Sequence, residues 1–128
     1  MSEVRRLRGT AARLSGRKAE WRAALMLMLK GYRILGFRLK TRAGEIDLLA
    51  HRGNTLAVVE VKQRSTIEAA LECVTAEQRE RLRRAARLVA ARRPGLRSAI
   101  IRLDLMALAP GRWPRHIVDA WKGDSPLG

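Results

Sequence analysis

Two apolar runs that carry charged residues decide the fold of this chain: GEIDLLA at residues 44–50 and LAVVEVK at residues 56–62. Both are typical of β-strands. Alternation along a strand puts Asp47 on one face of the first run, and Glu60 with Lys62 on one face of the second. Charges within such apolar strands are costly unless they have a partner or a function. The pattern Asp, then Glu-x-Lys, is typical of a metal-dependent phosphodiesterase centre.

The short polar break between the two runs predicts a hairpin turn and leaves two registers open. A two-residue Gly-Asn loop at residues 53–54 sets Asp47 opposite Glu60 and Glu45 opposite Lys62. A four-residue loop brings Glu45 opposite Glu60 instead. Both registers place a carboxylate about 5 Å from that of Glu60, which is destabilising unless a cation binds between them. Mg²⁺ is the expected ion, with Mn²⁺ as the alternative, because one or two carboxylates and phosphate oxygens suffice to hold it.

These residue types suit the hydrolysis of a phosphodiester. Carboxylates hold a divalent ion that polarises the phosphate and lowers the pKa of a bound water. The ammonium group of Lys62 orients the attacking water or offsets charge on phosphorus. The alternative is that these charges are solvated strand ends joined by ordinary ion pairs. Glu20, on the first predicted helix, either reaches the same sheet edge as a further ligand or is a helix-surface residue beside Arg17.

Further motifs accompany the two runs along most of the chain, from about residue 14 to residue 122. They are Gly16 with Ala19-Glu20, Gly31-Tyr32-Arg33-Ile34-Leu35, Gly44-Glu45-Ile46-Asp47-Leu48, Val59-Glu60-Val61-Lys62 with Arg64, Val74-Thr75, Arg102-Leu103-Asp104, and His116-Ile117 with Ala120-Trp121. In these residues the chain resembles the YraN-like uncharacterised bacterial proteins, which are assigned to the restriction-endonuclease-like superfamily.

The resemblance implies an α/β fold in which helices flank a central mixed β-sheet. It also implies Mg²⁺ as the cofactor and places the superfamily's acidic and lysine positions on Glu20, Asp47, Glu60 and Lys62. Fold and motif do not by themselves establish turnover.

The chain departs from the pattern of the resembled family at three places. Phe37-Arg38 stands where an Arg-Asn pair is usual, Gln63 replaces a common Thr, and Gln78 stands where a Lys is frequent. The first change could alter a nucleic-acid contact, whereas both glutamines still offer side-chain hydrogen bonds.

The charge of the chain indicates its partner. Its 27 Lys and Arg residues exceed its 12 Asp and Glu residues, which gives a net charge of +15 and a pI near 11.7. Such an excess indicates a polyanion, and we expect nucleic acid, DNA in preference to RNA. An anionic membrane surface competes, but no apolar run approaches the roughly 20 residues that span a bilayer. The basic residues expected to contact nucleic acid are Arg33, Arg38, Lys40, Arg64, Arg83, Arg84 and Arg87.

The chain length allows one domain with a modest core. We expect a domain over residues 15–122, between a basic N-terminal arm at residues 1–14 and a C-terminal tail at residues 123–128. Its elements follow the order helix, three strands, helix, two strands. The ranges outside the two runs are a helix at 17 to about 30, a strand at 32–40, a helix from 75 to 94, and strands at 98–108 and 116–121.

Two details of these helices are predicted. The first helix is expected to bury the stripe of Trp21, Leu25, Met28 and Leu29. The second begins with Thr75-Ala76-Glu77-Gln78, a capping box that gives Gln78 a structural role ahead of any assistance to the site.

Two functions from different classes follow: a metal-dependent nuclease, or a non-catalytic nucleic-acid-binding module that serves partner proteins. An adaptor driven by charge alone is a weaker third hypothesis. Trp113 and Trp121 either stack on bases or pack at the rim of the core. A single cysteine, Cys73, and the absence of a secretory run near the N-terminus favour the cytoplasm. A paired symmetric substrate would suit a homodimer.

Overall fold

The structure is a computed structural model, and it describes residues 17–124. The predicted arm at residues 1–14 and the end of the predicted tail, residues 125–128, lie outside the described residues. Helix α1 is described over residues 17–29. The elements after it are β1 (Arg33–Thr41), β2 (Gly44–Arg52), β3 (Thr55–Gln63), α2 (Ile67–Glu72), α3 (Ala76–Ala91), β4 (Ile100–Leu108) and β5 (Arg115–Ile117), with short 3₁₀ turns at Pro94–Leu96 and Lys122–Asp124.

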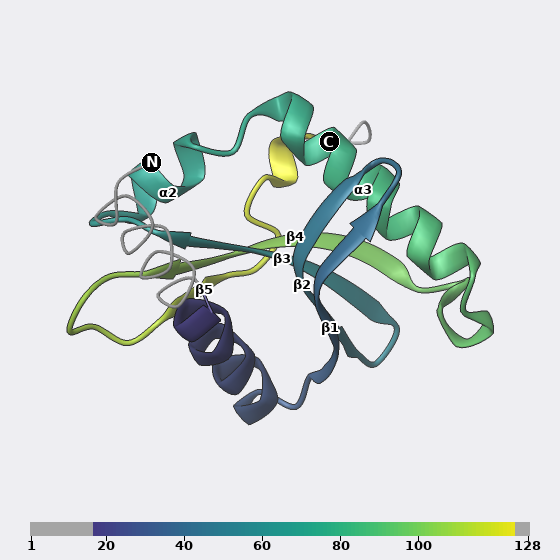
Figure 1. Ribbon diagram of the computed structural model, residues 1–128, viewed down its shortest axis with the longest axis horizontal. Coiled ribbons are helices and arrows are strands. Elements are labelled where there is room, and N and C mark those ends of the chain that lie inside the picture. Colours follow the sequence, from purple (N-terminus) through teal and green to yellow (C-terminus); the bar gives the residue numbers. More distant parts are fainter. Residues whose placement is uncertain (1–16, 125–128) are drawn as a thin grey trace, which may run out of the picture.

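Within residues 17–124, five strands form one mixed sheet in the order β1-β2-β3-β4-β5. β1, β2 and β3 form an antiparallel meander, β3 and β4 run parallel, and β5 returns antiparallel to β4. The parallel pair requires a long crossover, which α2 and α3 supply. α1 lies on one side of the sheet and α3 on the other (Figure 1). The expected fold class, a central mixed sheet flanked by helices, is confirmed.

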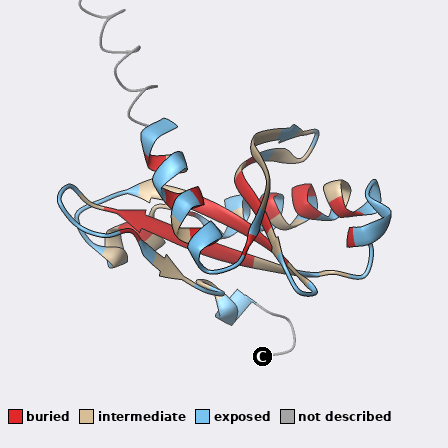
Figure 2. Cartoon of the chain, turned by 90° about the horizontal axis from the view of Figure 1, so that it is seen from below, coloured by how far each residue is buried: buried red, intermediate tan, exposed pale blue. Residues whose placement is uncertain are grey.

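The prediction of which face of α1 is buried was wrong. Trp21 is 63% exposed and Leu29 is 75% exposed. Instead, α1 turns Ala19, Ala23, Ala24 and Leu27 towards the sheet. Small alanine side chains let the helix approach the sheet closely, so the larger side chains remain outside. The buried side of α1 faces the sheet in Figure 2.

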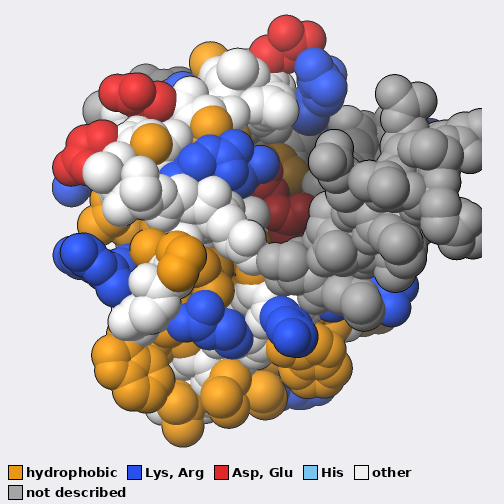
Figure 3. All heavy atoms as spheres, turned by 60° about the vertical axis from the view of Figure 1, so that its left-hand side comes forward, with side chains coloured by type: hydrophobic (Ala, Val, Ile, Leu, Met, Phe, Trp, Pro, Cys, Tyr) orange, Lys and Arg blue, Asp and Glu red, His pale blue; other side chains and the backbone are white. Residues whose placement is uncertain are grey.

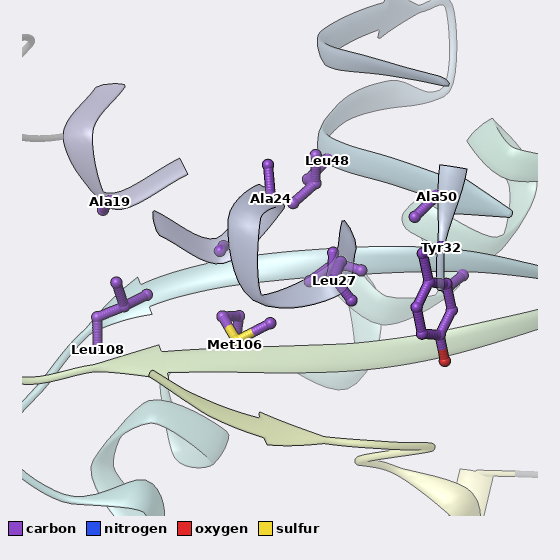
Figure 4. Close-up of a cluster of buried hydrophobic side chains, with 11 residues drawn as sticks. Ala19, Ala24, Leu27, Tyr32, Leu48, Ala50, Met106 and Leu108 are labelled. Carbon is purple, nitrogen blue, oxygen red and sulfur yellow. The ribbon is translucent and has the colours of Figure 1, made fainter. Parts of the chain in front are cut away.

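The core on the α1 side joins this helix to three strands. Figure 4 shows Ala24 and Leu27 of α1 near Leu48 of β2 and Met106 of β4. The core on the other side joins α3 to the sheet, through Leu82, Ala85, Ala86 and Ala90 of the helix packed on Ile46, Leu49, Leu56, Val58 and Leu103. Both faces of the central strands are therefore covered, which leaves few buried positions for polar groups.

The capping box at the start of α3 is confirmed. The Thr75 hydroxyl accepts the N–H of Gln78 at 3.1 Å, and the Gln78 side-chain oxygen accepts the N–H of Thr75 at 2.8 Å. Gln78 thus has the structural role that its position in the motif predicted.

Two sequence predictions missed details of the second half of the chain. The short helix α2, which Thr66 caps through its side chain, was not among the expected elements. The last strand was expected over residues 116–121 and ends at Ile117. The chain then turns through Asp119, whose φ of +50° lies in the left-handed region, so the strand cannot continue. No helix within residues 17–124 combines the length and apolar character needed to cross a bilayer.

Candidate metal and nucleic-acid site

The hairpin of β2 and β3 brings Asp47 beside Glu60. Arg52 pairs with Thr55, so the loop is the two-residue Gly-Asn turn, and the four-residue alternative is wrong. Gly53 has a φ of +59°, which suits the first central position of such a tight hairpin turn. The ladder ends at the Leu48–Val59 pair, one step before Asp47.

Beyond the ladder, side chains replace backbone pairing. The Asp47 carboxylate accepts the N–H of Val61 at 3.0 Å, which holds it against β3. Glu45 lies opposite Lys40 on the other side of the β1–β2 hairpin. Its predicted position opposite Lys62 was wrong, because β2 leaves β3 at this point and the hairpin bends towards α3 (Figure 1).

Glu60 is the unusual group of the pair. It is 9% exposed, and its pKa is raised to about 8, first by burial and then by the hydrogen bond and charge of Asp47. Lys62 acts in the opposite sense, with its Nζ 3.7 Å from Glu60 Oε2. A single ammonium group therefore does not balance the two carboxylates, and a second cation would stabilise the ionised form of Glu60.

Glu20 is not brought to this pair. Its carboxylate accepts the Nε–H of Arg38, at 2.9 Å from Oε1 and 3.1 Å from Oε2. Within residues 17–124 no group of three or more His, Cys, Asp and Glu side chains is placed to hold a metal ion. Glu20 is not a solvated residue of the helix surface either, since its side chain is 14% exposed and pairs with Arg38.

Arg38 gives a physical account of one departure from the family pattern. Its φ is +49°, a left-handed conformation in which Asn is several-fold enriched over most residues. An Asn, which the resemblance to the family leads us to expect here, would suit this backbone. Arg38 adopts the conformation and forms an ion pair with Glu20.

Asp47 and Glu60 offer the donor set of a hard divalent ion. Their carboxylate oxygens suit Mg²⁺, which is commonly held by one or two carboxylates while water and substrate oxygens complete its shell. The raised pKa of Glu60, beside a second carboxylate, is the observation in this structure that fits a cation there.

Basic side chains gather in a groove between the tip of the β1–β2 hairpin and α3. Two adjoining cavities of about 330 and 530 Å³ share Arg42 and Leu88. The basic residues that line this hairpin groove are Lys40, Arg42, Arg81, Arg84, Arg87, Arg92 and Arg93. Glu77 pairs with Arg81 and Glu80 with Arg87, whereas Arg42, Arg84, Arg92 and Arg93 have no carboxylate partner in the described part of the chain.

The structure separates the basic residues predicted to contact nucleic acid. Lys40, Arg84 and Arg87 line the hairpin groove. Arg83 pairs with Asp124, Arg38 pairs with Glu20, and Arg33 is exposed at the start of β1. Arg64 lies at the end of β3, beside another cavity. The sequence interpretation missed Arg42, for which the signal was a basic residue in the turn between two strands.

A second buried carboxylate, Asp104, belongs to a separate network. Arg102 donates to both of its oxygens at 2.8 Å. His116 Nε2, at 2.8 Å, and the N–H of Asp119, at 2.9 Å, complete its partners. Lys30 contacts His116 Nδ1, and since an ammonium group only donates, Nδ1 accepts and Nε2 donates to Asp104.

Fold and site together define a small mixed-sheet α/β protein with a carboxylate pair, of which Glu60 is buried and Asp47 half-buried, and an adjacent lysine. The profile described as "Uncharacterised protein family UPF0102" matches residues 19–108, and the chain belongs to this family. This finding confirms the resemblance to the YraN-like proteins.

Similar proteins extend over most of the chain. A UPF0102 protein of Caulobacter vibrioides (strain NA1000 / CB15N) is 69% identical over 120 residues, which cover 94% of this chain and 96% of that protein. A UPF0102 protein of Parvibaculum lavamentivorans is 49% identical over 114 residues, which cover 89% of this chain and 86% of that protein. A UPF0102 protein of Rhizobium meliloti is 48% identical over 106 residues, which cover 83% of this chain and 87% of that protein.

Proposed function

We propose that this protein is a Mg²⁺-dependent nuclease that binds DNA and hydrolyses its phosphodiester bonds. The observation that carries the proposal is the pair of buried Glu60 and half-buried Asp47, with Lys62 Nζ 3.7 Å from Glu60 Oε2. Two acidic groups held together in a sheet with a single ammonium group to balance them are unfavourable in a purely structural role.

Each residue of this centre has a separate task in the proposal. Asp47 and Glu60 would hold the metal ion, and the N–H of Val61 fixes the orientation of Asp47. Lys62 orients the attacking water or offsets charge that builds on the phosphate. A bound Mg²⁺ would supply a polarised phosphate and a water of lowered pKa. Glu20 acts at most through Arg38.

The hairpin groove supplies the binding surface. Its unpaired arginines contact phosphates without reading sequence, which suits a protein whose net charge is +15. We also propose that the protein acts in the cytoplasm, for which its single cysteine is suited. A homodimer would present two such centres to a symmetric substrate.

Cleavage assays with variants test this function. Purified protein is incubated with duplex, flap and junction DNA in Mg²⁺ or Mn²⁺. Asp47→Asn and Glu60→Gln should abolish metal-dependent cleavage and leave DNA affinity unchanged, because the groove rather than the carboxylates supplies that affinity. Lys62→Ala should slow single-turnover cleavage about 100-fold or more while the metal still binds. Cleavage that persists in both carboxylate variants would refute the proposed centre.

A non-catalytic nucleic-acid-binding module is the second candidate. It is favoured by the pairing of Glu20 with Arg38, which leaves two rather than three of the predicted acidic residues at the centre. Wild-type protein that binds DNA in the groove but cleaves no substrate with either ion would decide for this alternative.

A further inference from the structure

A second basic cavity lies where the β3 and β4 strands end, away from the hairpin groove. It has a volume of about 350 Å³. Its lining includes Arg64 after β3, Glu68 of α2, Arg112 and Trp113 in the connection from β4 to β5, and Arg115 at the start of β5. We call it the Trp113 pocket. In Figure 3, which brings this side of the molecule forward, basic side chains are set among hydrophobic ones.

The charge of this pocket is not neutralised by its neighbours. In the described part of the chain, Arg64, Arg112 and Arg115 form no ion pair with a carboxylate; Arg64 donates to the carbonyl of Gln63. Glu68 is the one acidic residue of the lining, which leaves a net formal charge of +2. On α3, by contrast, Arg79 and Arg83 share Asp124, so their charges are already compensated.

Trp113 is exposed although the chain on both sides of it is held. Its side chain is 82% exposed, the largest exposure among the large hydrophobic residues described. Arg22 donates to the carbonyl of Arg112 at 2.8 Å, Pro114 is buried, and Arg115 begins β5. A rigidly flanked indole in water is unfavourable in a monomer and well suited to stack on a flat ligand.

The pocket also lies along the strand that carries the candidate metal site. Arg64 follows Glu60 by four residues, about 13 Å in an extended strand. Its N–H donates to the carbonyl of Leu108 at 3.1 Å, so the end of β3 is fixed to the end of β4. A nucleic-acid strand bound in the pocket would thus lie within a few nucleotides of the carboxylate pair.

We propose that the Trp113 pocket holds an unpaired stretch of a DNA strand, with a base stacked on Trp113 and the neighbouring phosphates on Arg64, Arg112 and Arg115. Exposed aromatic rings interleaved with unpaired cations are how proteins bind single strands without reading sequence. This inference rests on the proposed function and deepens it: the substrate is DNA with a junction between duplex and single strand. The hairpin groove binds the duplex part.

The test compares a blunt DNA duplex with the same duplex extended by a single-stranded tail, in chelator to prevent cleavage. Wild-type protein should bind the tailed DNA more tightly. Trp113→Ala should lose about 5- to 150-fold in affinity for the tailed DNA, the effect of one stacked base, and nothing for the blunt duplex. Trp113→Phe should retain most of the preference for the tailed DNA. In this variant the tail should no longer quench tryptophan fluorescence.

Two controls separate stacking from charge and from general damage. Trp21→Ala removes another exposed tryptophan, on α1, and should leave the preference for the tail unchanged. Replacing Arg112 and Arg115 with Ala should make tail binding less sensitive to salt. The slope of log K against log salt should become shallower by about 0.7 for each arginine removed.

The outcomes distinguish the two proposals. If Trp113→Ala keeps the preference for the tail, or loses affinity equally for both DNAs, or if wild-type protein binds both DNAs alike, the pocket is not a single-strand site and the proposed function stands. If wild-type protein binds neither DNA, the proposed function itself is wrong, and this inference falls with it.

Discussion

At the scale of single residues, two buried carboxylates differ in how their charge is balanced. Asp104 is fully buried, and burial alone would raise its pKa, but hydrogen bonds from His116 and Arg102 more than offset this effect and lower it. Glu60 faces a second carboxylate and one ammonium group, and its pKa is raised to about 8. Asp104 is therefore a satisfied structural group, whereas Glu60 is held in an unbalanced environment typical of functional sites.

The raised pKa of Glu60 predicts how stability depends on pH without metal. The native protein binds a proton at Glu60 more tightly than the unfolded chain does, because the pKa of this carboxyl group is near 4.5 in the unfolded chain. This contribution to the free energy of unfolding is fully present below about pH 4.5 and is lost as pH rises through about 8. The slope is at most about 1.4 kcal/mol per pH unit. Glu60→Gln should flatten the profile, measured by urea denaturation in chelator.

The matched control for this experiment is Glu72→Gln, which removes one carboxylate from the exposed side of α2. It should leave the profile of the wild-type protein unchanged between pH 5 and 8. Asp47→Asn should be as stable as wild type at pH 8 or slightly more so, since repulsion is removed and the Asn oxygen still accepts from Val61. Equal slopes for wild type and Glu60→Gln would show that Glu60 does not titrate in this window.

At the scale of elements, α3 shows that a run of arginines does not by itself make a phosphate-binding surface. Arg83 and Arg84 are adjacent residues of this helix, but their side chains lie in different surroundings. Arg83 Nη1 lies 3.2 Å from Oδ2 of Asp124, a residue of the last described turn. Arg84 lines the hairpin groove and has no carboxylate partner in the described residues. The same helix thus has one face neutralised by the C-terminal segment and another open to a ligand.

This difference predicts unequal effects of two otherwise identical substitutions. Arg84→Ala should weaken binding to blunt duplex DNA and lower the slope of log K against log salt by about 0.9, because one phosphate contact is lost. Arg83→Ala, which changes the net charge equally, should leave the slope unchanged. Titrations at several salt concentrations give both numbers. Equal changes in the two variants would place the duplex elsewhere than in the groove.

At the scale of the whole molecule, the Asp104 network joins elements that are distant in the sequence. Arg102 of β4 donates to the Tyr32 hydroxyl, at 2.6 Å, just before β1, and His116 of β5 contacts Lys30 at the end of α1. The carboxylate of Asp104 is the common acceptor. Removing its charge would leave the guanidinium of Arg102, which is 19% exposed, without a counter-charge.

We therefore expect Asp104→Asn to lower the free energy of unfolding by about 3–5 kcal/mol, the cost of breaking a buried ion pair. Urea denaturation measures this loss. Asp124→Asn is the control, since Asp124 also contacts two arginines but lies nearer to solvent, and should cost under about 1 kcal/mol. Similar losses for the two variants would argue against a special role of the network.

Much of the fold and part of the site could be predicted from the sequence, because those features are local. The hairpin register depends on a two-residue turn, and the turn with the alternation of residues 44–62 brought Asp47 to Glu60. The capping box of α3 was likewise predicted from a few adjacent residues, and it is confirmed.

The remaining features depend on contacts between residues far apart in the chain. Helical spacing predicted that α1 buries the stripe with Trp21, and only packing against the sheet selected the alanine stripe instead. From the sequence, Glu20 could reach several partners. In the structure its partner is Arg38, which lies in β1 with a left-handed backbone conformation. The charge of α3 was evident from the sequence, but its compensation by Asp124 was not.

The sequence by itself determined the strands, their alternation, the central hairpin and the family, because each follows from neighbouring residues or from motif blocks. Only the tertiary structure decided which charges remain unbalanced, since that depends on the partners that folding brings within a few ångströms. The unbalanced charges at Glu60 and in the hairpin groove are the ones on which the proposed function rests, and those around Trp113 support the proposed single-strand site.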